Sequence, residues 1–250
     1  MALAITLLAG LFFLLGAAVA WKARGTRAVG TYSIAVAFGS LACVAALDLI
    51  PEAQEAAEEL GVLVAVGLVV FGAAALVALD RMMPDHHANG ESHGHPHNHV
   101  HGEEEAAHLG TMAVLAVSVH NLAEGAAIYT IASLDLTAGL MLALGVGLHN
   151  APMGMLLYSP AEGNRSRGIA VLAAATLSTF VGGLIMFLLG GLIDEGMMLG
   201  VVCVALGMIA YILLAELLPA MIRTNDPKRS IAGALIGAAF VLVGLSLGGE

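Results

Sequence analysis

The chain has 250 residues, of which 59% are hydrophobic and only 11% are charged, and its mean hydropathy is +0.92. This composition offers too little polar surface to cover a water-soluble globule, so it predicts a polytopic membrane protein. The formal net charge is −10 with nine Lys and Arg residues, which excludes the extended basic surface that binding to nucleic acid requires.

Eight apolar segments are long enough to cross the hydrocarbon core of a membrane, which takes about 20 residues of helix. They cover residues 2–21, 28–50, 60–80, 109–132, 136–158, 168–192, 196–221 and 230–248. The segments lack the alternation of apolar and polar residues that a membrane β-barrel needs. The sequence therefore predicts an all-α fold, in which residues 1–250 form a single transmembrane domain of eight helices.

The charged residues between these segments predict the orientation of the chain. All nine Lys and Arg residues follow an odd-numbered segment, whereas the loops after the second, fourth and sixth segments carry only acidic residues. Because basic loops face the cytoplasm, we expect both termini outside. The first segment is interpreted as a retained helix, because Lys22 and Arg24 follow its apolar run, whereas the basic residues of a signal peptide precede it.

Residues 84–108, between the third and fourth segments, hold eight of the ten histidines. Their composition predicts a disordered cytoplasmic loop. Imidazoles at alternate positions near carboxylates make weak, exchangeable sites for borderline metals such as zinc, nickel and cobalt. The candidate ligands in this loop are His86, His87, His93, His95, His97, His99 and His101. A solvated, pH-responsive linker is the alternative interpretation.

Polar side chains also occur near the middle of the fourth and fifth segments, where a charge costs at least about 2.5 to 3.5 kcal/mol. His120 and Glu124 are one helical turn apart, and Asn121 lies beside them. The pair His149 and Asn150 repeats the His-Asn pair 29 residues later, in a helix of opposite direction. Imidazole nitrogens with carboxylate and amide oxygens suit a borderline divalent cation, whereas hydrogen bonding between helices is the alternative role.

A second pair of similar motifs lies in the second and seventh segments, which also run in opposite directions. Pro51 comes three residues after Asp48, and Pro219 comes three residues after Glu216. Both pairs of motifs predict an inverted repeat, an architecture from which many secondary transporters build a site near the middle of the membrane. Asp48 and Glu216 would lie toward opposite membrane faces and are candidates for the ion path or a gate. Solvated helix ends are the alternative interpretation.

With these motifs, the sequence resembles the ZIP (Zrt/Irt-like protein) family of divalent metal transporters, especially its bacterial zinc-uptake and GufA-like branches. The resemblance covers essentially the whole chain, including eight spans, outward termini and a histidine-rich loop after the third span. The family pattern His-Asn-x-Pro-Glu-Gly is met in the fourth segment by His120, Asn121, Glu124 and Gly125, with Ala123 in place of proline.

The fifth and sixth segments depart from the family in two positions. His149, Asn150 and Pro152 match the pattern, but Met153 stands where a second glutamate is usual, and the stretch around Gly182 lacks the acid often found in the sixth span. Two missing carboxylates favour a single metal site. We hypothesise that a thioether ligand from Met153 would shift the preference toward zinc and other thiophilic cations.

The resemblance implies a metal site between the fourth and fifth spans. His120, Glu124 and His149 would line the primary site, whereas Asn121 and Asn150 would face a secondary one.

The resemblance also implies the function. We expect a secondary transporter of the bacterial inner membrane that carries a divalent cation, with zinc the leading candidate, into the cytoplasm without catalysing a reaction or using an organic cofactor. Its partners would be divalent ions and the lipid bilayer, and a homodimer is left open. The alternatives are a nontransporting metal sensor of the same family, a proton-coupled exporter, and an intramembrane zinc hydrolase with Glu124 as general base.

Overall fold

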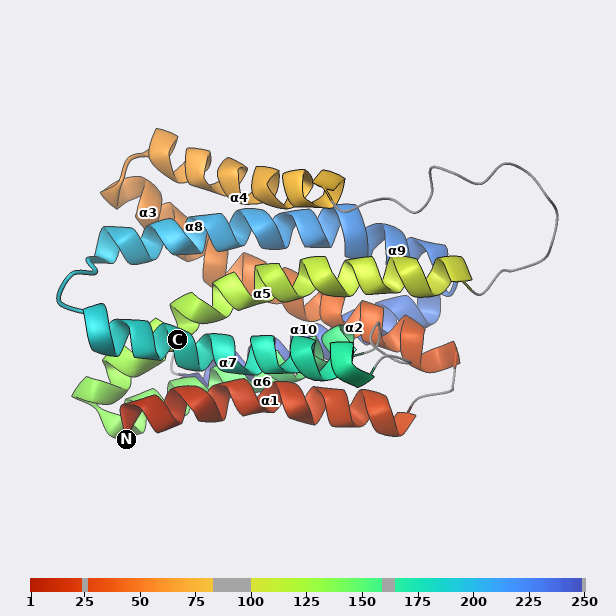
Figure 1. The fold of residues 1–250 in the computed structure, drawn as a ribbon, viewed down its shortest axis with the longest axis horizontal. Coiled ribbons are helices and arrows are strands. Elements are labelled where there is room, and N and C mark those ends of the chain that lie inside the picture. The colour runs from red at the N-terminus through yellow and green to blue at the C-terminus, as the bar shows by residue number, and fades with distance from the viewer. Residues whose placement is uncertain (24–26, 83–99, 159–164, 249–250) are drawn as a thin grey trace.

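The computed structural model describes residues 1–23, 27–82, 100–158 and 165–248, and these residues form helices joined by short turns, without any β-strand (Figure 1). In chain order the elements are α1 (Ala2–Ala23), α2 (Arg27–Val44), the π-helical turn η1 (Ala45–Leu49), α3 (Ile50–Glu59), α4 (Val62–Met82), α5 (Val100–Leu134), α6 (Leu136–Tyr158), α7 (Arg165–Leu189), α8 (Glu195–Tyr211), the π-helical turn η3 (Ile212–Leu217), α9 (Leu218–Arg223) and α10 (Pro227–Gly248).

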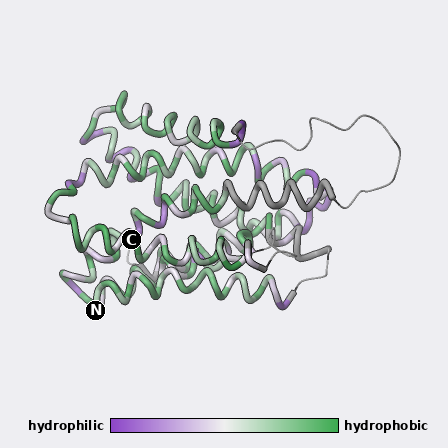
Figure 2. The backbone as a smooth tube through the Cα atoms, viewed as in Figure 1, coloured by the Kyte–Doolittle hydropathy of each residue, from purple (hydrophilic) through white to green (hydrophobic). Residues whose placement is uncertain are grey.

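Eight helical stretches among the described residues are long and apolar enough to cross a membrane, which confirms the predicted all-α polytopic fold. The second stretch combines α2, η1 and α3, and the seventh combines α8, η3 and α9. Hydrophobic residues occupy most of the length of the helices, and hydrophilic residues lie mainly near helix ends (Figure 2). A helix satisfies all its backbone groups internally, as a segment in hydrocarbon must.

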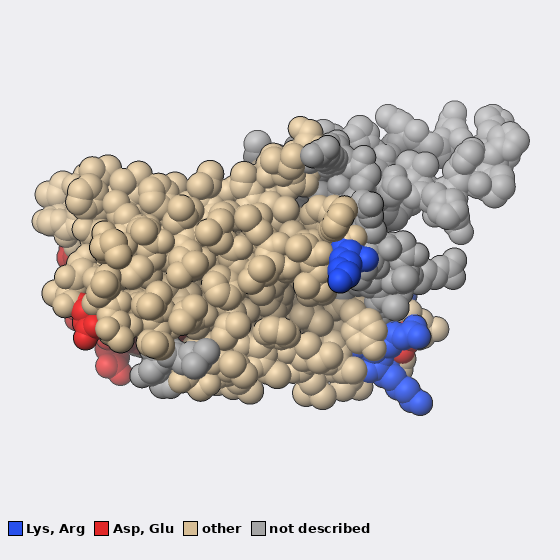
Figure 3. Space-filling view, turned by 90° about the horizontal axis from the view of Figure 1, so that it is seen from below, with Lys and Arg blue, Asp and Glu red and all other residues tan. Residues whose placement is uncertain are grey.

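The two ends of the bundle differ in charge. Helix α1 begins and α10 ends at one end, which we call the terminal face; we call the opposite end the basic face (Figure 1). On the side seen in Figure 3, the visible Lys and Arg side chains gather at the basic face, and most of the visible Asp and Glu side chains lie at the terminal face. This separation is the one expected from the distribution of charge among the loops.

Short turns join the helices at the terminal face. Gly61, with φ of 92°, separates α3 from α4 in a conformation that favours glycine. The Asp135 carboxylate accepts a hydrogen bond of 2.8 Å from the Thr137 backbone N–H, and Asp194 accepts one of 2.7 Å from the Met197 N–H. These caps satisfy N–H groups at the starts of α6 and α8. Helices α5 and α6 are therefore antiparallel neighbours linked by a single residue.

The second span is longer than the sequence predicts. It was expected to end at residue 50, but the helix continues through α3 to Glu59. Pro51 is tolerated because it lies in the first turn of α3, where a missing N–H costs little. Helix α3 is amphipathic, and its buried Ala56 belongs to a small core with Leu199 and Cys203 of α8.

Helix α5 also begins earlier than predicted. The backbone of residues 100–108 is helical, although the sequence predicts a disordered loop over 84–108. The run of Glu and Ala residues at 103–107 has high helix propensity, which accounts for the extension. Residues 83–99 lie outside the described part of the chain, and so do the histidines from His86 to His99.

The packing of the helices follows an inverted repeat. Helix α1 packs along α6 as α7 packs along α5, and α2 packs along α10 as α8 packs along α4. Two contacts match in detail: a Cβ atom on Gly125 would overlap the carbonyl oxygen of Thr179, and one on Gly154 would overlap that of Phe13. These glycines are again 29 residues apart. Glycine is required at both positions because helix backbones touch there.

Candidate metal centre

Three ionisable side chains meet where α5 and α6 cross. Glu124 Oε1 lies 2.6 Å from His149 Nε2 and 3.1 Å from His120 Nε2. The two imidazole rings are 6.1 Å apart between centroids. All three residues are buried, with exposed fractions of 4% for each histidine and 9% for Glu124. One donor atom from each residue lies within 4.8 Å of the others, a grouping that could hold a metal ion.

The local fold explains this convergence. His120 and Glu124 share one face of α5 because four residues make about one helical turn. His149 comes from α6, which packs against α5 after the one-residue turn at Asp135. Pro152 lies inside α6 and cannot donate to the Leu148 carbonyl, one residue before His149.

Two polar atoms of this centre, Glu124 Oε2 and His120 Nδ1, are buried and have no hydrogen-bond partner among the described residues. A buried polar atom without a partner costs roughly 1 to 3 kcal/mol, and more if it is charged. Zinc binds imidazole nitrogen and carboxylate oxygen at about 2.0 to 2.2 Å, so an ion here would replace the missing interactions. The donor set therefore suits a borderline divalent cation.

A cavity of about 500 Å³ leads from the three residues toward the terminal face. His120, Glu124 and His149 line it, together with apolar residues from the halves of α5, α6, α8 and α10 nearest that face. Asp48, Glu52, Glu55 and Glu195 line it as well. Glu55 and Glu195 are exposed, so the cavity connects the buried centre with the surface.

The two asparagines hold neighbouring helices. Asn121 Nδ2 donates to the Ala175 carbonyl oxygen at 3.3 Å and to Ser178 Oγ at 3.1 Å, both on α7. Asn150 Nδ2 lies 3.5 Å from the Ala9 carbonyl oxygen on α1. Neither asparagine lines the cavity. The structure thus places both amides at helix contacts, the alternative role that the sequence left open, although Asn121 Oδ1 has no hydrogen-bond partner within the described chain.

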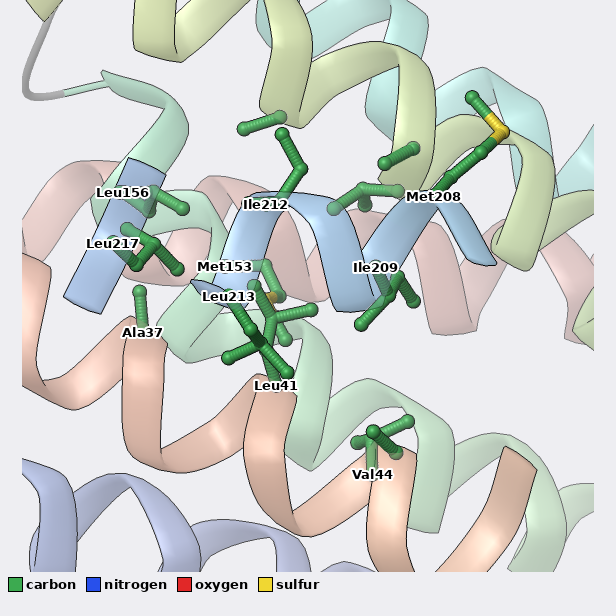
Figure 4. Close-up of a cluster of buried hydrophobic side chains, with 14 of the residues drawn as sticks. Ala37, Leu41, Val44, Met153, Leu156, Met208, Ile209, Ile212, Leu213 and Leu217 are labelled. Atoms are coloured by element: carbon green, nitrogen blue, oxygen red, sulfur yellow. The ribbon is translucent and has the colours of Figure 1, made fainter. Parts of the chain in front are cut away.

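Met153, one helical turn after His149 on α6, is buried among apolar side chains. Its side chain is 2% exposed and packs with Leu41 of α2 and Leu213 of η3 in a group of buried apolar residues (Figure 4). It does not line the cavity. At Gly182, a Cβ atom would overlap the Leu122 carbonyl oxygen, so this position has no room for an acidic side chain. Met153 thus lies in an apolar cluster, and Gly182 lies at a close contact between α7 and α5.

The remaining sequence candidates differ in how near they lie to the centre. Asp48, on η1, lines the cavity and lies within electrostatic range of all three donor residues. Glu216, on η3, belongs to the half of the molecule nearer the basic face and does not line the cavity. His101 falls in the helical backbone of α5, but its side chain is outside the described part of the structure.

Sequence reasoning missed three acidic residues of the cavity. Glu52 and Glu55 follow Asp48 at the spacing of one and two helical turns, which could have indicated a shared face if the helix had been extended beyond residue 50. Glu195 lies at the start of α8 and approaches the cavity only through tertiary packing. No local pattern marks it.

The chain is similar over nearly its whole length to bacterial zinc transporters. It is 28% identical over 256 residues to the zinc transporter ZupT of Escherichia fergusonii, an alignment that covers 98% of this chain and 95% of that protein. The zinc transporters ZupT of Shigella dysenteriae serotype 1 and Escherichia coli O7:K1 show the same identity and coverage. No family model matches the chain. The similarity includes both helices that supply the three donor residues.

Proposed function

We propose that the chain is a member of the ZIP family of metal transporters, that it is not an enzyme, and that it works as a secondary transporter that carries zinc into the cytoplasm. Its similarity over nearly its whole length to bacterial zinc transporters supports this proposal. The ion would bind between α5 and α6, at His120, Glu124 and His149. The single observation that carries this proposal is the convergence of these three buried side chains at the end of a cavity.

The basic loops predict which side of the membrane the cavity faces. Basic loops face the cytoplasm, so the basic face would be cytoplasmic and both termini would lie outside. The cavity then opens to the outside, from which zinc would enter.

Buried apolar side chains lie on the other side of the centre, toward the basic face. They form what we call the apolar seal, whose members are Ala37, Leu41, Val44, Met153, Leu156, Met208, Ile209, Ile212, Leu213 and Leu217 (Figure 4). These residues present apolar side chains, which a hydrated ion does not readily pass. The conformation would therefore be outward-open, and release into the cytoplasm would require the helices that carry the seal to separate.

The donor set supports a single bound ion with a preference for zinc. Two imidazoles and one carboxylate match the ligands of three-residue zinc sites, in which water or another group takes the fourth position. Hard cations such as magnesium prefer oxygen ligands. Met153 is buried among apolar side chains and Gly182 lies against the Leu122 carbonyl oxygen, so neither position supplies a second carboxylate.

The proposal is tested by transport in proteoliposomes of known orientation. Radioactive zinc should enter when offered at the terminal face, and the double variant His120→Ala with Glu124→Ala should lose this uptake while it still folds. Uptake that is undiminished in the double variant would reject the site. A wild-type protein that binds zinc but does not move it would favour the metal sensor, and net export under the same gradient would favour the exporter.

A further inference from the structure

The two π-helical turns form a matched pair. In η1 the Ile50 N–H bonds to the Ala45 carbonyl oxygen, and in η3 the Leu218 N–H bonds to the Leu213 carbonyl oxygen, five residues back in each case. Each turn is followed by a proline in the first turn of the next helix. π-Helical turns are rare and are often found at functional sites. Their occurrence in both halves extends the inverted repeat to the second and seventh spans.

The surroundings of the two turns also correspond. Helix α2 packs on α10 and contacts α6, whereas α8 packs on α4 and contacts α5. Asp48 in η1 and Glu216 in η3 occupy the same place in their turns, three residues before the proline. Asp48 therefore has a counterpart on the side of the molecule that is closed in this conformation.

The charges that follow the two turns break this symmetry. Glu52 and Glu55 come four and seven residues after Asp48, and both line the cavity. The residues four and seven positions after Glu216 are Ala220 and Arg223. One acid is thus matched by an apolar residue and the other by a cation.

The three acidic residues lie in the cavity that ends at the candidate metal centre. Asp48, Glu52 and Glu55 line the same cavity as Glu124, whose buried Oε2 has no hydrogen-bond partner in the described structure. Carboxylates that line a cleft with low-dielectric walls raise the local concentration of cations.

We propose that Asp48, Glu52 and Glu55 form a capture path for divalent cations at the terminal face. This inference rests on the proposed transport function. For a passive carrier it does not change the equilibrium distribution of zinc, which the gradient alone sets. It makes the KM for zinc lower at the terminal face than at the basic face, with a compensating difference between the two maximal rates.

The first test neutralises the path. The double variant Glu52→Gln with Glu55→Gln should raise the ratio of terminal-face KM to basic-face KM about threefold or more in proteoliposomes of known orientation at low ionic strength. The matched control is Glu58→Gln with Glu59→Gln, which removes the same charge from exposed positions of α3 that do not line the cavity. The control should keep the wild-type ratio.

Salt dependence gives a second readout. The wild-type KM at the terminal face should rise as salt screens the acids, because the Debye length falls from about 30 Å at 0.01 M to about 3 Å at 1 M. This dependence should be weaker in the Glu52→Gln, Glu55→Gln variant and unchanged in the control. An equal change of this salt dependence in the variant and the control would overturn the capture path, because the overall negative charge of the surface would then account for it.

Absence of zinc transport by the wild-type protein would refute the proposed function; normal transport with unchanged KM ratios in the path variants would refute only this inference.

Discussion

Glu124 contributes the only carboxylate of the proposed centre and contacts both histidines. Its Oε1 is close to both imidazoles, at 2.6 Å and 3.1 Å, while its Oε2 is buried without a hydrogen-bond partner among the described residues. Metal binding requires an ionised carboxylate and at least one unprotonated nitrogen on each imidazole. Protons and zinc therefore compete for the same atoms of the centre.

This competition predicts that the affinity for zinc falls as the pH falls. If one proton is displaced for each bound ion, the affinity should decrease about tenfold per pH unit. Isothermal titration calorimetry between about pH 7.5 and pH 5.5 would measure it, on protein whose seven candidate loop histidines are replaced by asparagine. An affinity that does not change over this range would contradict binding through His120, Glu124 and His149.

At the scale of helices, close backbone contacts hold the donor residues in position. Gly125, next to Glu124, lies against the Thr179 carbonyl group of α7, and Gly154 of α6 lies against the Phe13 carbonyl group of α1. The hydrogen-bonded Asn121 and the more distant Asn150 contact the same two neighbouring helices. Each donor helix is thus fixed to a partner by a glycine contact and an amide.

Gly125→Ala should therefore destabilise the protein, by about 1 to 3 kcal/mol, because the added methyl group forces α5 and α7 apart. Gly67→Ala is the matched control, since a Cβ atom there meets no other atom within 4 Å and alanine favours the helix. Thermal melting followed by size-exclusion chromatography would compare the two variants. Equal melting temperatures would contradict the close contact of α5 with α7.

At the scale of the whole molecule, an open half and a closed half meet at the metal centre. The cavity occupies the half nearer the terminal face, and the apolar seal fills the other half beside the centre. Met198 of α8 lines the cavity, whereas Leu213 of η3, further along the same span, is buried in the seal. The two positions report on opposite sides of the centre.

Accessibility to a membrane-impermeant thiol reagent should differ between these positions. In a background with Cys43→Ala and Cys203→Ala, Met198→Cys should be labelled rapidly from the terminal face. Leu213→Cys should react slowly, and only from the basic face when zinc transport opens that side. Rapid labelling of Leu213→Cys from the terminal face would show that the apolar seal does not close the path.

Much of this architecture is predictable from the sequence because membrane helices must be long and apolar. The eight spans follow from that requirement, and the contact between His120, Glu124 and His149 follows from helical spacing and the repeated His-Asn pair. These features depend on local pattern and on the packing of two consecutive helices.

Other features depend on contacts between distant parts of the chain. Met153 could be a ligand by its position in the motif, yet it packs with α2 and η3, which no local pattern indicates. Glu195 reaches the cavity only because α8 packs beside α5. The sequence does not predict the π-helical turns either, because a proline three residues after an acidic residue is compatible with an ordinary helix end.

The π-helical turn η1 makes the lining of the entry dependent on backbone register. A π turn accommodates one more residue than an α turn, and each residue of an α-helix advances about 100° around the axis. Deleting one residue from 46–47 would leave the Ile50 N–H four residues after Ala45, which is the spacing of an α-helix, and would change the position of Asp48 within the turn although every carboxylate would be retained. The position of Asp48 at the cavity would therefore depend on the one additional residue that the π turn holds.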